Sequence, residues 1–336
     1  MRHDDVALFD AMFERFWRSR ARPGTTVVAE PMRVPPRVRA TLRLDAPAMM
    51  AGGPEATDDR DGLPVTQQTY SADDVWRHKD FAEFTAADVA HAADVIADLA
   101  WTPGLRVTRR WQTERRGAID ARRILAANMK HGGEPFVMPR RRRREAPRPL
   151  IVLSDISGSM EPYTRMLLLF AHLMAASDRR VEVFLFSTRL TRVTRQFAAP
   201  KIGDALARVR DAVKDWSGGT RIGAALFEFN RQWARRVVRG RPVVLLISDG
   251  WDLGEPQLLA REVARLQRSA VRLIWLNPLI GSPGYEPLTR GLQAALPYVD
   301  DFLSVRDMAS LDVLASHLST LPRRPHRPSS PRPPWN

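Results

Sequence analysis

The stretch Leu150-Ile-Val-Leu-Ser-Asp-Ile-Ser-Gly-Ser-Met160 joins a short apolar run to a loop of small polar residues. The run Leu150–Leu153 has the composition of a strand buried in a parallel sheet. The loop offers the carboxylate of Asp155 and the hydroxyls of Ser157 and Ser159 around one point, because Gly158 lets the backbone turn sharply. Ligands of open α/β sheets bind beyond the carboxyl ends of the strands, so this loop is a candidate site.

Apolar runs and helical patterns alternate through the whole segment from Pro149 to Leu321. We expect strands at residues 150–153, 181–186, 190–194, 243–247, 271–276 and 301–304. Helices are expected at residues 163–176, 204–216, 221–238, 256–268, 286–296 and 311–321. Such alternation implies right-handed crossovers and a mainly parallel sheet with helices on both faces. The predicted fold class is therefore α/β and Rossmann-like.

Two later loops add oxygen ligands to the first. Thr220 ends Ser-Gly-Gly-Thr just before a predicted helix, and Asp249 lies in Ser-Asp-Gly at the end of a predicted strand. A set of carboxylates and hydroxyls without His or Cys favours Mg²⁺ or Mn²⁺ over zinc. The candidate metal ligands are Asp155, Ser157, Ser159, Thr220 and Asp249. Since only the two aspartates are charged, the metal should also accept an acidic side chain from a partner.

Helix capping is the alternative for these residues, because Asp and Ser are favoured at helix N-termini. Each residue alone fits a cap, whereas their joint occurrence favours the metal site. For Asp252 we expect that it caps the helix that follows it rather than lying near the metal.

The first half of the chain divides into two further segments. Residues 1–65 contain a predicted amphipathic helix from Asp4 to Arg20 and a proline-rich linker. Residues 66–148 are predicted to be a basic helical region, with helix starts at Ser71 and Thr85 and a third helix near residues 118–130. Residues 149–321 form the α/β domain, and residues 322–336 are expected to be a disordered proline-rich tail.

Positive charge is concentrated next to the α/β domain. The net charge of the chain is +14, and residues 106–148 hold fourteen Lys and Arg against four acids. The run Arg140–Arg144 has three possible roles: a solvated stretch, a docking surface for an acidic partner, or nucleic-acid binding. Nucleic acid is the least favoured, because no zinc-finger, RNP or helix-turn-helix signature is present and Trp111 is the only aromatic between Arg106 and Gly133.

Several classes of protein do not fit the sequence. It has no cysteine, its N-terminal stretch is interrupted by acids unlike a signal peptide, and its longest apolar run, 166–176, is too short to cross a membrane. We therefore expect a soluble cytoplasmic protein. No nucleophile elbow, phosphate loop or histidine metal motif occurs, so we expect no enzyme. A metal-dependent hydrolase using Asp155 is a weaker alternative.

The three loops together resemble the metal-ion-dependent adhesion site of von Willebrand factor A (vWA) domains. That resemblance implies a vWA-type fold in which the two serines and Thr220 bind the metal directly. Further stretches are similar to the CoxE-like subfamily: Lys79-Asp-Phe-Ala-Glu83, the Arg-rich run with Arg148–Met160, Ile247–Asp252 and Leu296–Asp300. The similarity covers roughly residues 66–320.

Membership of the CoxE-like type implies an accessory role. Such proteins are often paired with a MoxR-type AAA+ ATPase, and the best-known members help to mature the molybdenum–copper site of carbon monoxide dehydrogenase. The resemblance thus implies a metal-dependent adaptor between an ATPase and a client metalloenzyme.

Overall fold

The computed structural model describes residues 71–99, 101, 103–129, 137–178, 180–213, 219–282 and 284–321. The predicted helix at Asp4–Arg20, the linker up to residue 65 and the tail at residues 322–336 lie outside the described residues.

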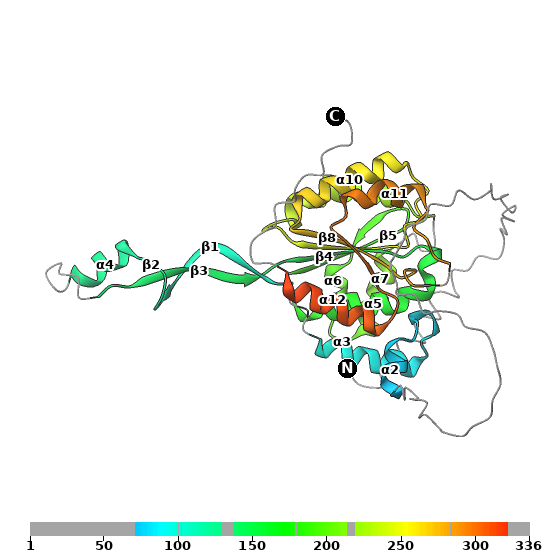
Figure 1. Cartoon of the computed structure of the whole chain (residues 1–336), viewed down its shortest axis with the longest axis horizontal. Coiled ribbons are helices and arrows are strands. Elements are labelled where there is room, and N and C mark those ends of the chain that lie inside the picture. Colours follow the sequence, from blue (N-terminus) through cyan, green and yellow to red (C-terminus); the bar gives the residue numbers. More distant parts are fainter. Residues whose placement is uncertain are drawn as a thin grey trace, which may run out of the picture.

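A six-stranded sheet of order β6-β5-β4-β7-β8-β9 forms the centre of the molecule (Figure 1). Its strands are β4 (Leu150–Asp155), β5 (Val181–Phe186), β6 (Leu190–Arg192), β7 (Val243–Ile247), β8 (Arg272–Asn277) and β9 (Asp301–Ser304). All neighbours are parallel except β6, which forms a hairpin with β5. Because β4 lies between β5 and β7, the loop after β4 reaches solvent at the middle of the sheet edge.

Helices cover both faces of this sheet, as the alternating pattern predicts. One face carries α5 (Glu161–Ser177), α6 (Thr194–Phe197), α7 (Ile202–Ala212) and α12 (Met308–Thr320); the other carries α8 (Ile222–Glu228), η4 (Phe229–Trp233), α9 (Ala234–Val237), α10 (Pro256–Ser269) and α11 (Arg290–Ala295). Side chains along β4 alternate between the two faces: Leu150 and Val152 join one core, Ile151 and Leu153 the other. The predicted α/β fold with helices on both faces is confirmed.

Short helices precede the sheet and pack on the face that carries α5 and α12. They are α2 (Ala72–Arg77), η1 (Phe81–Glu83) and α3 (Ala86–Asp98). The predicted helix starts are confirmed: Ser71 caps α2, and Thr85 forms a capping box with Asp88 at α3. Leu296–Tyr298 (η5) and Gly158–Met160 (η3) are short 3₁₀ turns within the α/β domain.

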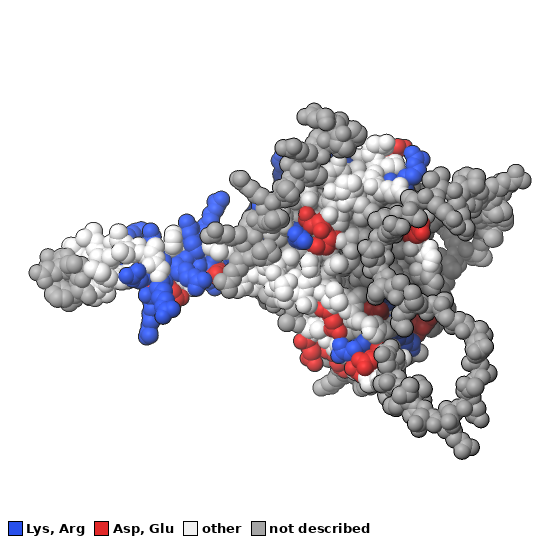
Figure 2. Space-filling view, in the orientation of Figure 1, with Lys and Arg blue, Asp and Glu red and all other residues white. Residues whose placement is uncertain are grey.

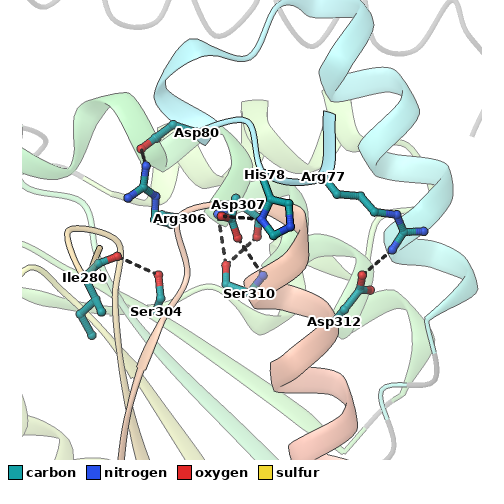
Figure 3. Close-up of polar contacts among 9 residues, drawn as sticks. All are labelled: Arg77, His78, Asp80, Ile280, Ser304, Arg306, Asp307, Ser310 and Asp312. Atoms are coloured by element: carbon teal, nitrogen blue, oxygen red, sulfur yellow. Dashed lines mark hydrogen bonds and ion pairs between the residues drawn. The ribbon is translucent and has the colours of Figure 1, made fainter. Parts of the chain in front are cut away.

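Polar contacts fasten these N-terminal helices to α12 and to the loop that precedes it (Figure 3). Arg77 binds Asp312 of α12 at 2.6 Å, and Arg306 pairs with Asp80 at 3.3 Å. The Phe81 N–H also donates to the Arg306 carbonyl at 2.8 Å, and the Phe81 ring is buried in the core. These contacts hold the N-terminal helices against the C-terminal part of the α/β domain.

A three-stranded antiparallel arm, of strand order β1-β3-β2, extends away from the six-stranded sheet (Figure 1). Strand β1 (Leu105–Glu114) pairs antiparallel with β3 (Arg140–Pro147), and the short β2 (Ala118–Ile119) and helix α4 (Ala121–Asn128) lie towards its far end. The third predicted helix is confirmed as α4. The prediction of a helical region up to residue 148 is wrong for both long strands. Each is stabilised by a partner strand distant in sequence, which no local helical period reveals.

None of the helices in the described parts of the chain is long and apolar enough to cross a membrane.

Candidate functional site

Asp155 is the last residue of β4 and lies fully buried at the carboxyl edge of the sheet. Its Oδ1 accepts a hydrogen bond from the Ser157 N–H at 2.9 Å. Its Oδ2 accepts one from the Ser248 hydroxyl at 2.8 Å. The Oγ atoms of Ser157 and Ser159 lie 3.2 Å apart. The loop therefore holds one carboxylate and two hydroxyls together, with Ser157 buried and Ser159 exposed.

Asp249 follows β7, the strand beside β4, and belongs to a loop with tight internal contacts. Its Oδ1 accepts from the Trp251 N–H at 2.9 Å, and Gly250 has a φ of 83°. A side chain at Gly250 would also press on Leu292, whose Cδ2 is 3.0 Å from an ideal Cβ. Glycine is therefore required to turn the chain directly after the second candidate carboxylate.

Thr220 lies on a third loop that packs against the Asp249 loop. Its carbonyl accepts from the Leu253 N–H at 3.0 Å, and an ideal Cβ on Gly219 would approach Leu253 Cδ1 to 2.6 Å. Thr220 itself is buried. The two loops are thus in contact at Gly219, where an added side chain would displace the exposed Leu253 side chain.

Asp252 holds these two loops together. Its Oδ1 accepts from the N–H groups of Ile222 and Gly254, at 2.9 and 3.0 Å, and its Oδ2 accepts from Gly223 at 3.4 Å. The prediction that Asp252 caps a helix is confirmed, but the prediction that it caps the helix that follows it is wrong. Asp252 binds the first turn of α8, which precedes it in the chain, whereas α10 begins at Pro256.

The electrostatics of Asp155 fit a bound cation. Burial raises the pKa of Asp155 to about 7, and repulsion from Asp249 adds to the increase, although hydrogen bonds from Ser157 and Ser248 oppose it. No basic side chain is among the groups that most affect this pKa. A buried carboxylate beside a second one and without a basic partner is costly when ionised, and a divalent cation would remove that cost.

The structure brings four of the five candidate ligands into one cluster, namely Asp155, Ser157, Ser159 and Asp249. Thr220 reaches the same edge of the sheet through the contacts of its loop. Helix capping does not explain the set. Ser157 precedes η3 without a capping hydrogen bond from its side chain, and the N-cap of α8 is Arg221.

Two polar residues of the site were missed by sequence reasoning. Ser248, fully buried, binds Asp155, and its carbonyl accepts from the Trp275 indole N–H at 2.9 Å. Asn277 ends β8 and donates to the Asp249 carbonyl at 3.0 Å. A polar residue directly after an apolar run was the available signal for both. Beside the site, Trp251 and Leu253 are 63% and 66% exposed.

Comparison with known families agrees with this geometry. Residues 92–311, more than half of the chain, match the family described as VWA domain containing CoxE-like protein. The chain belongs to this CoxE-like family. No curated protein matches the chain.

Some solved structures are also similar to this CoxE-like chain. Proximal thread matrix protein 1 from the mussel byssus has 19% identity and a TM-score of 0.36, over 51% of this chain and 46% of that one. A structure of the same mussel protein with a zinc-occupied MIDAS motif gives 19% identity and a TM-score of 0.35 over the same shares. BatB from Bacteroides thetaiotaomicron gives 16% identity and a TM-score of 0.36, over 51% and 96%. The chain spans less than half of the mussel protein's length.

Proposed function

We propose that this CoxE-like chain is a metal-dependent protein-binding accessory factor. A divalent cation, Mg²⁺ or Mn²⁺, is held by Asp155, Asp249 and the hydroxyls of Ser157, Ser159 and Thr220. The observation that carries the proposal is the buried carboxylate of Asp155 at the sheet edge, whose ionisation is opposed by burial and by the charge of Asp249. Oxygen donors of this kind suit a hard cation that keeps open or water-filled positions.

The cation would complete its coordination with an acidic side chain of a partner. Hydroxyl ligands leave much of the positive charge of the ion uncompensated, which favours an anionic ligand from outside. The exposed Trp251 and Leu253 supply apolar area beside that position, and buried aromatic anchors commonly dominate binding energy at protein interfaces. The arrangement suits capture of a partner better than chemistry, since no His, Cys or Lys accompanies the two aspartates among the candidate ligands.

The family membership directs the choice of partner. We propose a MoxR-type AAA+ ATPase, with a client metalloenzyme of the molybdenum carbon monoxide dehydrogenase type as the precedent. The protein would act as an adaptor that presents the client to the ATPase during maturation.

The test combines metal titration with capture from native lysate. Tagged protein is incubated with Mg²⁺ or with EDTA, and captured proteins are identified by mass spectrometry. We expect an AAA+ ATPase or a metalloenzyme only with Mg²⁺, and its loss in Asp155→Asn and Thr220→Ala. Asp94→Ala, at an exposed position of α3, is the control and should capture normally.

Two results would overturn the proposal. Capture that ignores both EDTA and Asp155→Asn would exclude the metal site as the docking point. Turnover of phosphate esters by pure protein, lost in Asp155→Asn, would instead assign a hydrolase.

A further inference from the structure

The arm formed by β1 and β3 begins at the opposite end of β4 from the metal site. Gly104 and Arg148 join the arm to the sheet through the Arg148 N–H, which donates to the Gly104 carbonyl at 3.2 Å. Strand β4 starts two residues later, at Leu150, and ends at Asp155. Six strand residues span roughly 17 Å. The base of the arm and the metal site therefore lie at opposite ends of β4.

A bulge near the base of the arm turns two arginines outward. Val107 pairs with Glu145 and Trp111 with Arg143, so residues 108–110 lie opposite Arg144 alone. The bulge is fastened from both sides. The Thr108 hydroxyl accepts from the Arg110 N–H at 3.3 Å, and the Arg109 carbonyl accepts from the Arg143 guanidinium at 2.6 Å. Bulges of this kind commonly redirect side chains towards a ligand.

The bulge opens onto a groove of about 640 Å³ between the arm and the sheet domain. It is lined by Arg106, Thr108, Arg109, Arg110, Arg144, Ala146 and Gly240. Gly240 has a φ of 78°, a backbone conformation that favours glycine, and the Arg106 guanidinium lies directly over it. No carboxylate is among the described residues that line the groove.

The positive charge of this groove is not neutralised from within. In the part of the chain that the structure describes, no carboxylate lies within ion-pair distance of Arg106, Arg109, Arg110 or Arg144. The nearby Arg148 is buried, and both burial and the charges of Arg106 and Arg241 lower its pKa. Gathering like charges is unfavourable unless an anionic group binds among them.

Towards its far end, the described part of the arm exposes apolar side chains. Large hydrophobic side chains lie exposed around α4 and the start of β3: Ile119, Leu125, Met129, Val137 and Met138. Arginines follow them along the arm towards the groove (Figure 2). Exposed apolar area bordered by charge marks a surface for a protein or a membrane.

These features favour an acidic protein over the two other anionic partners. A nucleic acid offers phosphates but nothing for the exposed apolar residues, and the Trp111 ring already packs against the guanidinium groups of Arg141 and Arg143, 4.5 and 4.1 Å from its centroid. A membrane penetrated by these apolar residues would leave the groove at the base without contact. Only an extended acidic surface with apolar residues matches the whole arm.

We propose that the β1–β3 arm and the groove at its base form a second docking surface. Its partner is a protein segment that carries Asp or Glu for the groove arginines and apolar side chains for the end of the arm. Binding there requires no metal.

Matched charge variants of the full-length protein test this surface. The arm variant is Arg109→Gln/Arg110→Gln/Arg144→Gln, in which all three side chains are exposed. The control is Arg195→Gln/Arg208→Gln/Arg268→Gln, which removes three exposed arginines from the helices α6, α7 and α10. Both variants lose the same charge, so a difference between them reports position. Circular dichroism checks that both are folded.

The probe is a fluorescent peptide of alternating Glu and Leu, and binding is followed by anisotropy. We expect the arm variant to raise Kd about tenfold and the control to change it less than twofold, since interface charges at specific positions dominate such binding. The titrations are made in EDTA, so that no metal at the Asp155 site can bind the Glu side chains of the peptide, and Asp155→Asn should then leave the Kd unchanged. This separates failure of the arm from failure of the metal site.

Other outcomes reject the proposal. Equal losses in both variants would reduce binding to net charge. Tighter binding of a DNA duplex of equal charge would assign nucleic acid to the arm. Preferential binding to phosphatidylserine vesicles over phosphatidylcholine vesicles, stronger than peptide binding and lost in the arm variant, would assign a membrane. Leu125→Ser/Met129→Ser, which removes apolar area at the end of the arm, should also weaken peptide binding; an unchanged Kd would contradict the apolar part of the surface.

Discussion

Ser248 and Asp155, 93 residues apart in the chain, are joined by a hydrogen bond of 2.8 Å between the Ser248 hydroxyl and Asp155 Oδ2. Both residues are fully buried. Asp155 ends β4 and Ser248 directly follows β7, the parallel strand beside it. The donated hydrogen bond favours the ionised carboxylate, which is the form that binds a cation.

Ser248→Ala is therefore expected to raise the pKa of Asp155 further and to weaken Mg²⁺ binding about tenfold at neutral pH, the size of a charge-assisted hydrogen bond. Isothermal titration calorimetry measures the affinity. Ser154→Ala is the control, because the Ser154 hydroxyl is buried but contacts only a backbone carbonyl, at 3.5 Å. Equal affinities in wild type and Ser248→Ala would exclude this support of the metal site.

The raised pKa of Asp155 predicts how metal binding depends on pH. Since the metal-free folded protein holds the proton up to about pH 7, Mg²⁺ must displace it below that pH. The affinity should rise about tenfold per pH unit up to about pH 7 and level off above it. Titrations between pH 5 and 9, about two units either side of this midpoint, measure the slope. The same affinity throughout would contradict a protonated Asp155.

The stability of the metal-free protein should change in the opposite direction. The pKa of Asp155 is raised from its ordinary value of 3.8 to about 7 in the folded chain. The stability that this pKa shift contributes to the folded, metal-free chain is thus fully present below pH 3.8 and is lost as the pH rises through 7. Mg²⁺ should consequently raise the melting temperature more at pH 8 than at pH 6, about one unit either side of the transition. Asp155→Asn should remove this difference.

Asp252 is expected to support the site without binding metal. Asp252→Ala removes the acceptor for three N–H groups, those of Ile222 and Gly223 in α8 and that of Gly254. Loss of a capping acceptor costs about 1 kcal/mol, and the Thr220 loop should become less well positioned. We expect a lower melting temperature and a severalfold weaker Mg²⁺ affinity. Asp252→Asn retains one side-chain oxygen, so its melting temperature and Mg²⁺ affinity should lie between those of the wild type and of Asp252→Ala. A full loss of Mg²⁺ binding in Asp252→Asn would indicate that Asp252 is a direct ligand.

Trp251 is expected to act on the partner alone. It is 63% exposed, and only its backbone N–H contacts Asp249. Trp251→Ala should leave the Mg²⁺ affinity within twofold and weaken partner capture about tenfold or more, as for an interface anchor. Val313→Ala, at a 60% exposed position of α12, is the control. Weaker Mg²⁺ binding in Trp251→Ala would show that the ring also shapes the site.

The sequence by itself determined the sheet domain and the identity of the candidate ligands. Continuous apolar runs such as Val243–Ile247 are strands buried on both faces, and local capping signals such as Thr85 with Asp88 fix helix starts. Both are short-range effects, so they are visible in neighbouring residues. The loop from Asp155 to Ser159 was likewise visible, because strand and ligands adjoin in the chain.

Only the tertiary structure decided which distant residues meet. Arg140–Arg144 is a strand because β1 pairs with it, and no local pattern contains that partner. Asp252 caps a helix that precedes it by about 30 residues, and Ser248 binds Asp155 because β7 lies beside β4. Pairing between strands and contacts between loops depend on the whole packed sheet, whose hydrogen bonds and buried side chains form only after the chain has folded.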